Sequence, residues 1–399
     1  MNPPPLELEE AQARLLALAA PLGVECMPVG EALGRYLAEP LMARRTQPPA
    51  DLSAMDGYAV RRTDLPGPWR VIGESACGHP FGAAVAGCEA VRIATGALLP
   101  EGADAVLLQE DCRRDGDRLE LSQAPSQRAN IRKTGMDFAA GQELLPRGIR
   151  LGPAQIGLTL TAGHRFVVVH RRVRLAVLDT GDELAADPER CAAHQIPASN
   201  GAVLAAMAAA CPCEVSHGAP VGDCLESLVA AFEAAAGADV IVTSGGASVG
   251  DHDLIRPALE QWGAEIDFWR VAIKPGKPLL VARKGRKVIL GLPGNPVSSH
   301  VTAYLFLLPL IRALSGAGDA LPLRIEARAA EDMPAGGARR EFVRARWNGS
   351  TVTPLRNQDS GALASLAASN ALIERPAGAP PAPAGSTVGV YLLGNGGTA

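Results

Sequence analysis

The middle of the chain alternates short apolar runs with stretches of helical periodicity. Residues 173–316 contain strand-like runs rich in aliphatic or aromatic side chains, and segments with helical periodicity separate them. This alternation is typical of an open, mostly parallel sheet with helices on its faces. We therefore predict an α/β domain over residues 173–319. Its strands are predicted at residues 173–178, 213–217, 239–243, 265–271 and 287–290.

Local signals at the ends of helices refine this prediction. Ser199 or Asn200 can cap a helix that runs to residue 210. Asp223 can cap a second helix, and Gly237 suits the left-handed position that closes it. Pro296 is tolerated in the first turn of a helix that continues to residue 314. Three helices between the strands are expected from these residues.

The regions on either side of the α/β domain favour β structure. Residues 48–137 hold short alternating segments separated by Gly and Pro, which predicts a mostly β domain. Residues 320–399 show further strand-like runs, which predicts a C-terminal β-barrel domain. Helical stretches at 6–20 and 153–163 flank the first β domain in sequence, so we expect them to pack together. The resulting discontinuous N-terminal domain, with helical and extended segments, comprises residues 1–47 and 138–172.

Composition limits the class of protein more than its fold. A length of 399 residues exceeds a single hydrophobic core, so at least two packed units are needed. Hydrophobic residues make up 47% of the chain and charged residues 20%, and the formal net charge is only -4. Such a chain creates no field that attracts nucleic acid or an anionic membrane. We expect neither nucleic acid nor membrane as a partner.

Several features bear on the compartment. The first residues lack the basic and apolar segments of a signal peptide, so a cytoplasmic protein is expected. The apolar run 301–314 is too short to span a bilayer and contains Pro309 and Arg312, which favours a buried helix. The eight cysteines show no C-x-x-C spacing and are interpreted as reduced packing residues. Cys211 and Cys213 could hold a soft metal, but no second Cys or His pair lies near them.

The loops that follow the predicted strands contain unusual residues. Ligands of open α/β sheets bind beyond the carboxyl ends of the strands, so these loops are expected to share one rim. The first strand leads into an acidic loop at residues 179–183, the third into a Ser/Gly loop at 244–250, and the last into a Gly/Pro loop at 291–296. The Ser/Gly loop offers backbone N–H groups and hydroxyls that suit a phosphate or another oxyanion. A tight turn between strand and helix is the alternative explanation of its glycines.

Charged residues add a chemical expectation to the rim. Lys274 and Lys277 lie on a segment stiffened by Pro275 and Pro278, where two ammonium groups could balance an anion with several charges. A solvated basic turn would explain the charge but not the prolines. Carboxylates collect beside the same loops, and oxygen ligands near phosphate-binding loops suggest Mg²⁺. The acidic residues concerned are Asp182, Glu183, Asp223, Asp251 and Asp253, of which Asp223 could equally be only a helix cap.

Six ordered motifs resemble those of the molybdopterin molybdenumtransferase family, which includes the C-terminal domain of gephyrin. They extend over most of the chain, and so many motifs in one order make coincidence an inadequate explanation. The motifs occupy residues 53–60, 93–97, 180–184, 244–250 with Asp253, 274–278 and 291–298.

The resemblance implies a four-domain subunit whose third domain is of the molybdopterin-binding type. It also implies a homodimer with composite active sites, each between the α/β domain of one subunit and the first two domains of the other. The family's catalytic positions match Asp56, Thr95, Glu183, Asp223 and Asp253, with Glu183 and Asp253 as metal ligands. Its substrate-binding positions match Ser244, Gly245, Gly246, Ser248, Lys274, Lys277, Pro293, Asn295, Pro296, Ser298, Arg339 and Ser360. Arg340 or Arg344 could supply the guanidinium in place of Arg339, and Arg270 stands where relatives often carry Lys.

The activity implied by the resemblance is insertion of molybdate into adenylylated molybdopterin (molybdopterin-AMP), which releases AMP and yields molybdenum cofactor. Mg²⁺ is the implied cofactor. Substrate would be handed over from molybdopterin adenylyltransferase, and product would pass to apo-molybdoenzymes. Two alternatives are an adenylyltransferase, which resembles only residues 173–316, and a non-catalytic scaffold of the gephyrin type. The motif at 53–60 and the C-terminal barrel argue against the first alternative, and the lack of a long linker or fused enzyme argues against the second.

Overall fold

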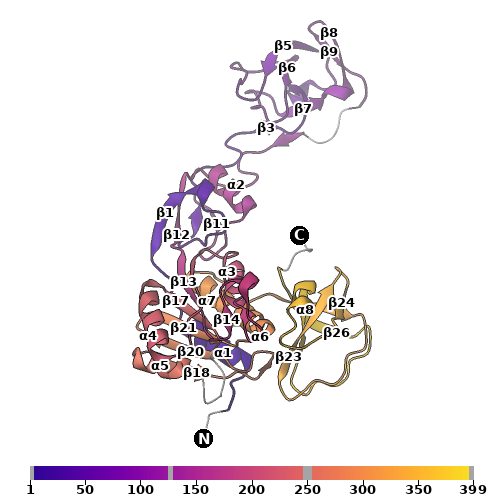
Figure 1. Cartoon of the computed structure of the whole chain (residues 1–399). Helices are drawn as coiled ribbons and strands as arrows, with labels where there is room; N and C mark the ends of the chain where they lie inside the picture. Colours follow the sequence, from indigo (N-terminus) through magenta and orange to yellow (C-terminus); the bar gives the residue numbers. More distant parts are fainter. Residues whose placement is uncertain (1–3, 125–128, 246–253, 395–399) are drawn as a thin grey trace.

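A computed structural model describes residues 4–124, 129–245 and 254–394 of the chain. The molecule is elongated, with an α/β unit and a β-barrel side by side at one end (Figure 1). An arm of paired strands leads away from the α/β unit and carries a separate β unit at its far end. The predicted fold class, an α/β domain with a mostly β domain, a mixed N-terminal region and a C-terminal barrel, is confirmed.

The α/β unit is built on a six-stranded sheet with the order β16-β13-β17-β21-β20-β18. The first four strands in this order are parallel. β20 runs antiparallel to them, and the edge strand β18 runs antiparallel to β20. Strand β20, which we had not predicted, forms a hairpin with β21 through a turn at Gly285 and Arg286. The strands are β13 (Val173–Asp179), β16 (Cys213–His217), β17 (Val240–Ser244), β18 (Glu265–Trp269), β20 (Leu280–Lys284) and β21 (Lys287–Leu292).

Helices cover both faces of this sheet. One face packs against α3 (Asn200–Ala208) and a long helix made of α6 (Pro296–Thr302), a π turn (η6, Ala303–Leu307) and α7 (Leu308–Leu314). The other face packs against α4 (Leu225–Ala234) and α5 (Ile255–Gln261). The long helix is apolar enough to cross a membrane by composition alone, but 83% of its apolar window is buried inside the protein. The prediction of a buried core helix at 301–314 is therefore confirmed.

The first helix of the chain belongs to the α/β unit, not to the arm. α1 (Leu8–Ala17) buries Leu8, Ala11 and Leu15 in the same core as strands β13 and β17. Its Gln12 also donates a hydrogen bond from Nε2 to the carbonyl of Leu305, at 2.9 Å, in the long helix. The prediction that the stretch 6–20 packs with the stretch 153–163 is wrong. Adjacency of two helices to one β domain in sequence does not decide which apolar surface each of them covers.

Two predicted helix ends also differ from the structure. Asp223 does not cap α4, because the helix begins two residues later and Cys224 occupies the N-cap position. The Asp223 carboxylate instead accepts a hydrogen bond from the backbone N–H of Asp182 at 3.3 Å. Gly237 is not left-handed, since a 3-10 turn (η5, Ala235–Gly237) leads directly into extended chain at Ala238. Pro296 lies in the first turn of α6 as predicted.

The other units are all rich in β structure. The arm pairs β1 (Val24–Pro28) with β12 (Phe166–His170) and β2 (Leu41–Met42) with β11 (Glu143–Leu145), and it includes α2 (Pro153–Thr161). The distal β unit has a sheet with the order β7-β4-β6-β5-β9-β8, beside a short ladder of β3 (Leu52–Ser53) and β10 (Ile131–Arg132). The strands of that sheet are β4 (Gly57–Val60), β5 (Trp69–Ser75), β6 (Glu89–Ile93), β7 (Ala105–Leu108), β8 (Cys112–Asp115) and β9 (Arg118–Leu121).

The C-terminal domain is a closed barrel, as predicted. The sheet order is β23-β24-β22-β26-β25, and a further pairing between β23 and β25 closes it. A short strand, β19 (Ile273–Lys274), leaves the α/β unit to pair with β23 and so joins the two domains. The barrel comprises β22 (Arg324–Ala329), β23 (Arg340–Trp347), β24 (Thr351–Pro354), β25 (Ala371–Arg375) and β26 (Thr387–Leu392), together with the helix α8 (Leu363–Ala368).

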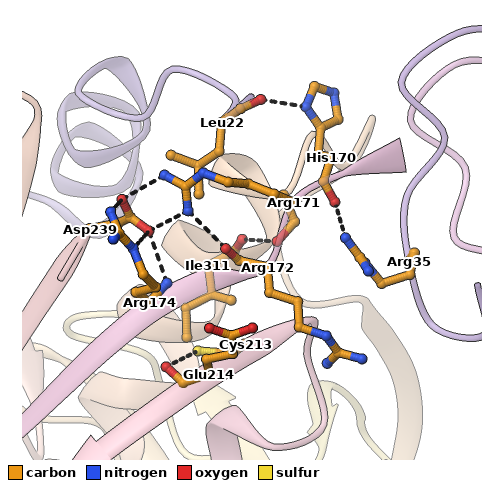
Figure 2. A network of polar contacts seen from close by, with 11 residues as sticks. Leu22, Arg35, His170, Arg171, Arg172, Arg174, Cys213, Glu214, Asp239 and Ile311 are labelled. Atoms are coloured by element: carbon orange, nitrogen blue, oxygen red, sulfur yellow. Dashed lines mark hydrogen bonds and ion pairs between the residues drawn. The ribbon is translucent and has the colours of Figure 1, made fainter. Parts of the chain in front are cut away.

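Polar contacts fix the point where the arm meets the α/β unit (Figure 2). Nη1 and Nη2 of Arg171 each donate to the Asp239 carboxylate at 2.8 Å. The same carboxylate accepts the backbone N–H of Arg174 at 2.9 Å. His170 Nδ1 lies 2.7 Å from the carbonyl oxygen of Leu22, so the two chain segments that enter and leave the arm are tied together.

We predict that Leu15→Ala destabilises the α/β unit, because it removes a side chain that is 1% exposed in its core. A substitution of this kind typically lowers the free energy of unfolding by about 2–5 kcal/mol. Urea unfolding would measure the decrease in the free energy of unfolding, and hydrogen exchange would show which elements are destabilised. Faster exchange is expected in β13 and α7. The matched control is Leu160→Ala in α2, whose side chain is 53% exposed. Faster exchange confined to α2 in the Leu15 variant would contradict the observed packing.

Candidate functional site

The loops that leave the parallel strands meet at one rim, as predicted from their positions. Asp179 at the end of β13 is in register with Ser244 of β17, and Ser244 is in register with Leu292 of β21. The backbone N–H of Gly245 also donates to the carbonyl of Leu292 at 3.1 Å. The three strands therefore end level with one another, which brings their loops together. Gly246 and Ser248 of the Ser/Gly loop, and Asp251 and Asp253 just after it, lie outside the described residues.

The floor beneath the Ser/Gly loop contains polar groups without partners. The hydroxyls of Thr180 and Ser244 are buried and have no hydrogen-bond partner in the described parts of the chain. Gly245 has φ +110°, and a Cβ there would lie 2.6 Å from the carbonyl oxygen of Thr180, so the position requires glycine. Buried polar groups normally find a partner, so a ligand or ordered water is expected at this floor.

The acidic loop is held by the segment that precedes α4. Asp223 N–H donates to Asp182 Oδ1 at 3.0 Å, and Asp182 N–H donates back to Asp223 Oδ2. Thr180 is bridged to Val221, which fixes the two segments side by side. Glu183 is exposed beside them. The structure thus brings Glu183 and Asp223 to the same part of the rim.

The acidic rim has the donor chemistry of a magnesium site but not a complete ligand set. Among the described residues, no group of three or more His, Cys, Asp or Glu side chains could hold a metal ion. Mg²⁺ commonly takes only one or two protein carboxylates and completes its shell with water and substrate phosphates. The exposed oxygen ligands of Asp182 and Glu183 fit that pattern. Asp253, the second predicted ligand, lies outside the described residues.

A second feature is a cavity of about 700 Å³ between the α/β unit and the barrel. Five of the predicted substrate-binding residues line this cavity. Two basic residues come from the segment after β18, one hydroxyl comes from α6, and a guanidinium and a hydroxyl come from the barrel. These residues are Lys274, Lys277, Ser298, Arg339 and Ser360. The lining also includes Arg344, Arg356 and Arg375, so six basic residues face three carboxylates, those of Glu331, Glu341 and Asp359. This excess of cations, together with the two hydroxyls, suits an oxyanion.

The backbone around the two lysines is sterically constrained. Lys274 Nζ forms a 3.0 Å ion pair with Glu341 of β23, which holds its ammonium at the edge of the barrel. Gly276 has φ +100°, and a Cβ there would lie 2.5 Å from Cγ2 of Thr302 in the long helix. The segment can therefore approach the helix only because this residue is glycine. The proximity of the segment to α6 places Lys277 and Ser298 on one cavity wall.

The Gly/Pro loop joins the rim to this cavity. Asn200 at the start of α3 donates to the carbonyl of Gly294 at 2.7 Å. Asn295, the N-cap residue of α6, donates from Nδ2 to the Ser360 hydroxyl at 3.1 Å. The N–H of Val297 donates to the carbonyl of Ser360, also at 3.1 Å. Pro293 and Pro296, two further predicted substrate-binding residues, border this connection in the same loop.

The three candidate arginines of the barrel have different surroundings. Arg339 lines the cavity and donates one hydrogen bond to the carbonyl of Ile273 at 3.0 Å. Arg340 is engaged by Glu9 and Glu374, so its charge is already balanced. Arg344 also lines the cavity, but it is only 1% exposed and its guanidinium donates to backbone carbonyls of the barrel. Arg339 is therefore the best placed to donate to an anion. Glu341 and Gln358 also line the cavity, and no motif in the sequence indicated them.

Asp56 and Thr95 lie together in the distal β unit. The Asp56 carboxylate accepts the backbone N–H of Thr95 at 2.7 Å and its hydroxyl at 3.0 Å. These two bonds, with help from Arg92, hold the pKa of Asp56 below its usual value. Both residues are exposed. Within one subunit the structure does not bring this pair to the rim, because the arm separates β4 and β6 from the α/β unit (Figure 1).

Comparison with known proteins accounts for almost the whole chain. Residues 6–163 match the model of the MoeA N-terminal region (domain I and II), residues 176–313 that of a probable molybdopterin binding domain, and residues 326–393 that of the MoeA C-terminal region (domain IV). A molybdopterin molybdenumtransferase of Haemophilus influenzae is 38% identical over 316 residues, which is 78% of each chain. One from Staphylococcus aureus is 31% identical over 400 residues, covering 97% of this chain and 96% of the relative.

Solved structures show the same arrangement. A molybdopterin biosynthesis MoeA protein of Pyrococcus horikoshii OT3 superposes with a TM-score of 0.84 at 26% sequence identity. That comparison covers 98% of this chain and 100% of the other. A second structure of a protein with that name has a TM-score of 0.79 at 30% identity and covers 99% of this chain.

We predict that Thr95→Val raises the pKa of Asp56 toward its usual value. The substitution removes the hydroxyl bond but keeps the backbone N–H bond, so the pKa should rise yet remain depressed. Because hydrogen bonds to the Asp56 carboxylate favour its charged form, loss of one of them raises its pKa. NMR titration of the Asp56 carboxyl carbon would measure it. Thr134→Val is the matched control, because Thr134 donates in the same way to Asp51 and should leave Asp56 unchanged. An unaltered Asp56 pKa in Thr95→Val would contradict the assignment.

Proposed function

The chain belongs to the molybdopterin molybdenumtransferase family, and we propose that it inserts molybdate into molybdopterin-AMP, with release of AMP and formation of molybdenum cofactor. The observation that carries this proposal is the cavity between the α/β unit and the barrel, where Lys274, Lys277 and Arg339 surround a space large enough for a small oxyanion. Ser298 and Ser360 add hydroxyls that can hydrogen-bond its oxygens.

Two anions must be brought together in this reaction. The cationic cavity would hold molybdate, whereas the Ser/Gly loop with Ser244, Gly245, Gly246 and Ser248 would hold the phosphates of molybdopterin-AMP. Pro293, Asn295 and Pro296 would border both ligands, because Asn295 contacts Ser360 of the cavity while Gly294 adjoins Gly245 of the rim. Fixed donors that need no rearrangement are effective in stabilising developing negative charge. The substrate supplies its own dithiolene sulfurs, so no protein thiol is required.

We further propose that Glu183 and Asp253 hold Mg²⁺ and that Asp223 orients the acidic loop through Asp182. Bound Mg²⁺ would supply charge compensation for the phosphates of the nucleotide. The oxygen-only ligands of the described rim support this assignment.

Asp56 and Thr95 are proposed to act from the partner subunit of a homodimer. Their exposure at the end of a long arm, away from the rim of the same chain, supports a composite site. Adenylylated substrate would come from a molybdopterin adenylyltransferase, and product would pass to apo-molybdoenzymes. The distal β unit and the barrel favour this function over that of the adenylyltransferase, because both are present here and contribute the proposed groups. No observation on the described surface favours a scaffold, and a cytoplasmic location remains the expectation from the sequence.

The decisive experiment combines purified protein with molybdopterin-AMP, Mg²⁺ and molybdate. Release of AMP and activation of an apo-molybdoenzyme, both dependent on molybdate, are expected. Omission of molybdate is the control. AMP release without any activation of the acceptor would refute the proposed transfer.

We predict that Asp56 complements Glu183 across a dimer. A mixed dimer of Asp56→Ala and Glu183→Ala chains would contain one site with both substitutions and one intact site. Each such dimer should therefore regain about half of the wild-type activity, since one of two symmetric sites survives. Assay after subunit exchange, with exchange verified by mass, would measure this. No recovery despite verified exchange would show that both residues act in the same chain.

Lys277→Ala should raise the molybdate requirement without weakening nucleotide binding. Loss of one charge-assisted hydrogen bond costs about 1.5–3 kcal/mol, which corresponds to a roughly ten- to hundred-fold increase in half-saturation. Excess molybdate should then restore activity in part. Lys287→Ala is the control, because Lys287 begins β21 at the end of the sheet opposite the rim. An unchanged molybdate requirement with weaker binding of molybdopterin-AMP would assign Lys277 to the phosphates instead.

A further inference from the structure

Arg344 is a buried arginine in the wall of the oxyanion cavity. It is 1% exposed and lies on β23, five residues beyond Arg339. Its Nη2 donates to the backbone carbonyls of Asn357 at 3.0 Å and Asp359 at 2.9 Å. The guanidinium is therefore anchored to the loop that precedes Ser360.

The backbone of Arg344 holds the same loop. Its N–H donates to Oε1 of Gln358 at 3.0 Å, and its carbonyl accepts Nε2 of Gln358 at 2.9 Å. The N–H of Leu355 donates to that carbonyl as well, at 2.8 Å. Contacts from four residues of one loop, Leu355, Asn357, Gln358 and Asp359, thus converge on a single strand position. Ser360, which ends this loop, contacts Asn295 and Val297 at the start of α6.

The charge of Arg344 is only partly compensated in the free protein. Nε and Nη1 are buried and have no hydrogen-bond partner among the described residues. Burial lowers the pKa of the guanidinium, and the nearby Asp359 carboxylate opposes this shift. Burying a cation without a close counterion is energetically unfavourable. A negative charge in the adjacent cavity would relieve this cost, because Coulomb interactions are strong where water is excluded.

We propose that Arg344 is a positioning residue for the oxyanion cavity: it fixes the Ser360 loop, and its uncompensated charge favours an anion there. This inference rests on the proposed function for the identity of the anion. Arg344 would act through the loop and through its electric field at the cavity wall. It would therefore affect binding of molybdate more than binding of the nucleotide substrate.

Three variants separate the two contributions. Arg344→Met removes the charge and the side-chain bonds, Arg344→Lys keeps the charge, and Gln358→Leu loosens the loop while the arginine remains. Half-saturation by molybdate should rise about tenfold or more in Arg344→Met, by analogy with loss of a charge-assisted bond. Smaller increases in the molybdate concentration at half-saturation are expected for Arg344→Lys and Gln358→Leu. The KM for molybdopterin-AMP and the kcat at excess molybdate should stay near the wild-type values.

A second readout does not depend on catalysis. Molybdate alone, added to the purified protein, should raise the Tm of the wild type. The increase in Tm should be smaller for Arg344→Lys and smallest for Arg344→Met. Arg346→Met is the matched control, because Arg346 is exposed two residues along the same strand and should respond like the wild type.

The outcomes distinguish this inference from the proposed function. If wild-type protein forms no product with molybdate, the proposed function fails whatever Arg344 does. If the wild type is active but a folded Arg344→Met variant keeps the wild-type molybdate requirement and Tm response, Arg344 has no role in anion recognition. Equal impairment in Arg344→Lys and Arg344→Met would overturn the contribution of charge. Should Arg344→Met fail to fold, Arg344→Lys and Gln358→Leu still test the loop, and normal molybdate binding in both would overturn the proposal.

Discussion

The carboxylate of Asp239 fixes the geometry on which the rest of the molecule depends. Asp239 directly precedes β17, and its carboxylate accepts hydrogen bonds from Nη1 and Nη2 of Arg171, which follows the last strand of the arm. These charge-assisted bonds hold the pKa of Asp239 well below its usual range despite its partial burial. A bidentate pair defines direction as well as distance, so it restrains the angle between the arm and the sheet. Since the arm carries Asp56 and Thr95 at its far end, a small change of angle here would displace those residues considerably (Figures 1 and 2).

The start of the long core helix links the other two parts of the site. α6 begins where the Gly/Pro loop leaves the sheet, and its first residues contact the Ser360 loop of the barrel. On the other side, Gly276 permits the lysine segment to approach Thr302 of the same helix. Most of the helix interior is buried and close-packed, so it supports the cavity walls. Groups from the α/β unit and the barrel can then surround a single anion without rearrangement.

Patterns of local sequence determined the nature of the domains. Short aliphatic runs alternating with helical segments were sufficient for the α/β sheet, because each apolar strand must be covered on both faces. In residues 48–137 and 320–399, short apolar segments separated by Gly and Pro likewise indicated β structure. Short motifs also identified the lysines, the Ser/Gly loop and the acidic loop, since the order of strands alone brings their carboxyl ends to one edge.

Tertiary structure decided what depends on contacts between distant segments. By composition, the apolar face of α1 could pack against the arm or against the α/β unit. The structure shows that it packs in the α/β core beside Leu305. The barrel has three arginines within one six-residue stretch, 339–344. Glu9 and Glu374 form ion pairs with Arg340, whereas the 355–360 loop buries Arg344. Asp223 has the residue type and position expected of a helix N-cap, but its carboxylate accepts a hydrogen bond from the backbone N–H of Asp182 instead. Sequence specifies which groups a segment can offer, whereas the free energy of burial and pairing, summed over partners far apart in the chain, selects the ones that face a ligand.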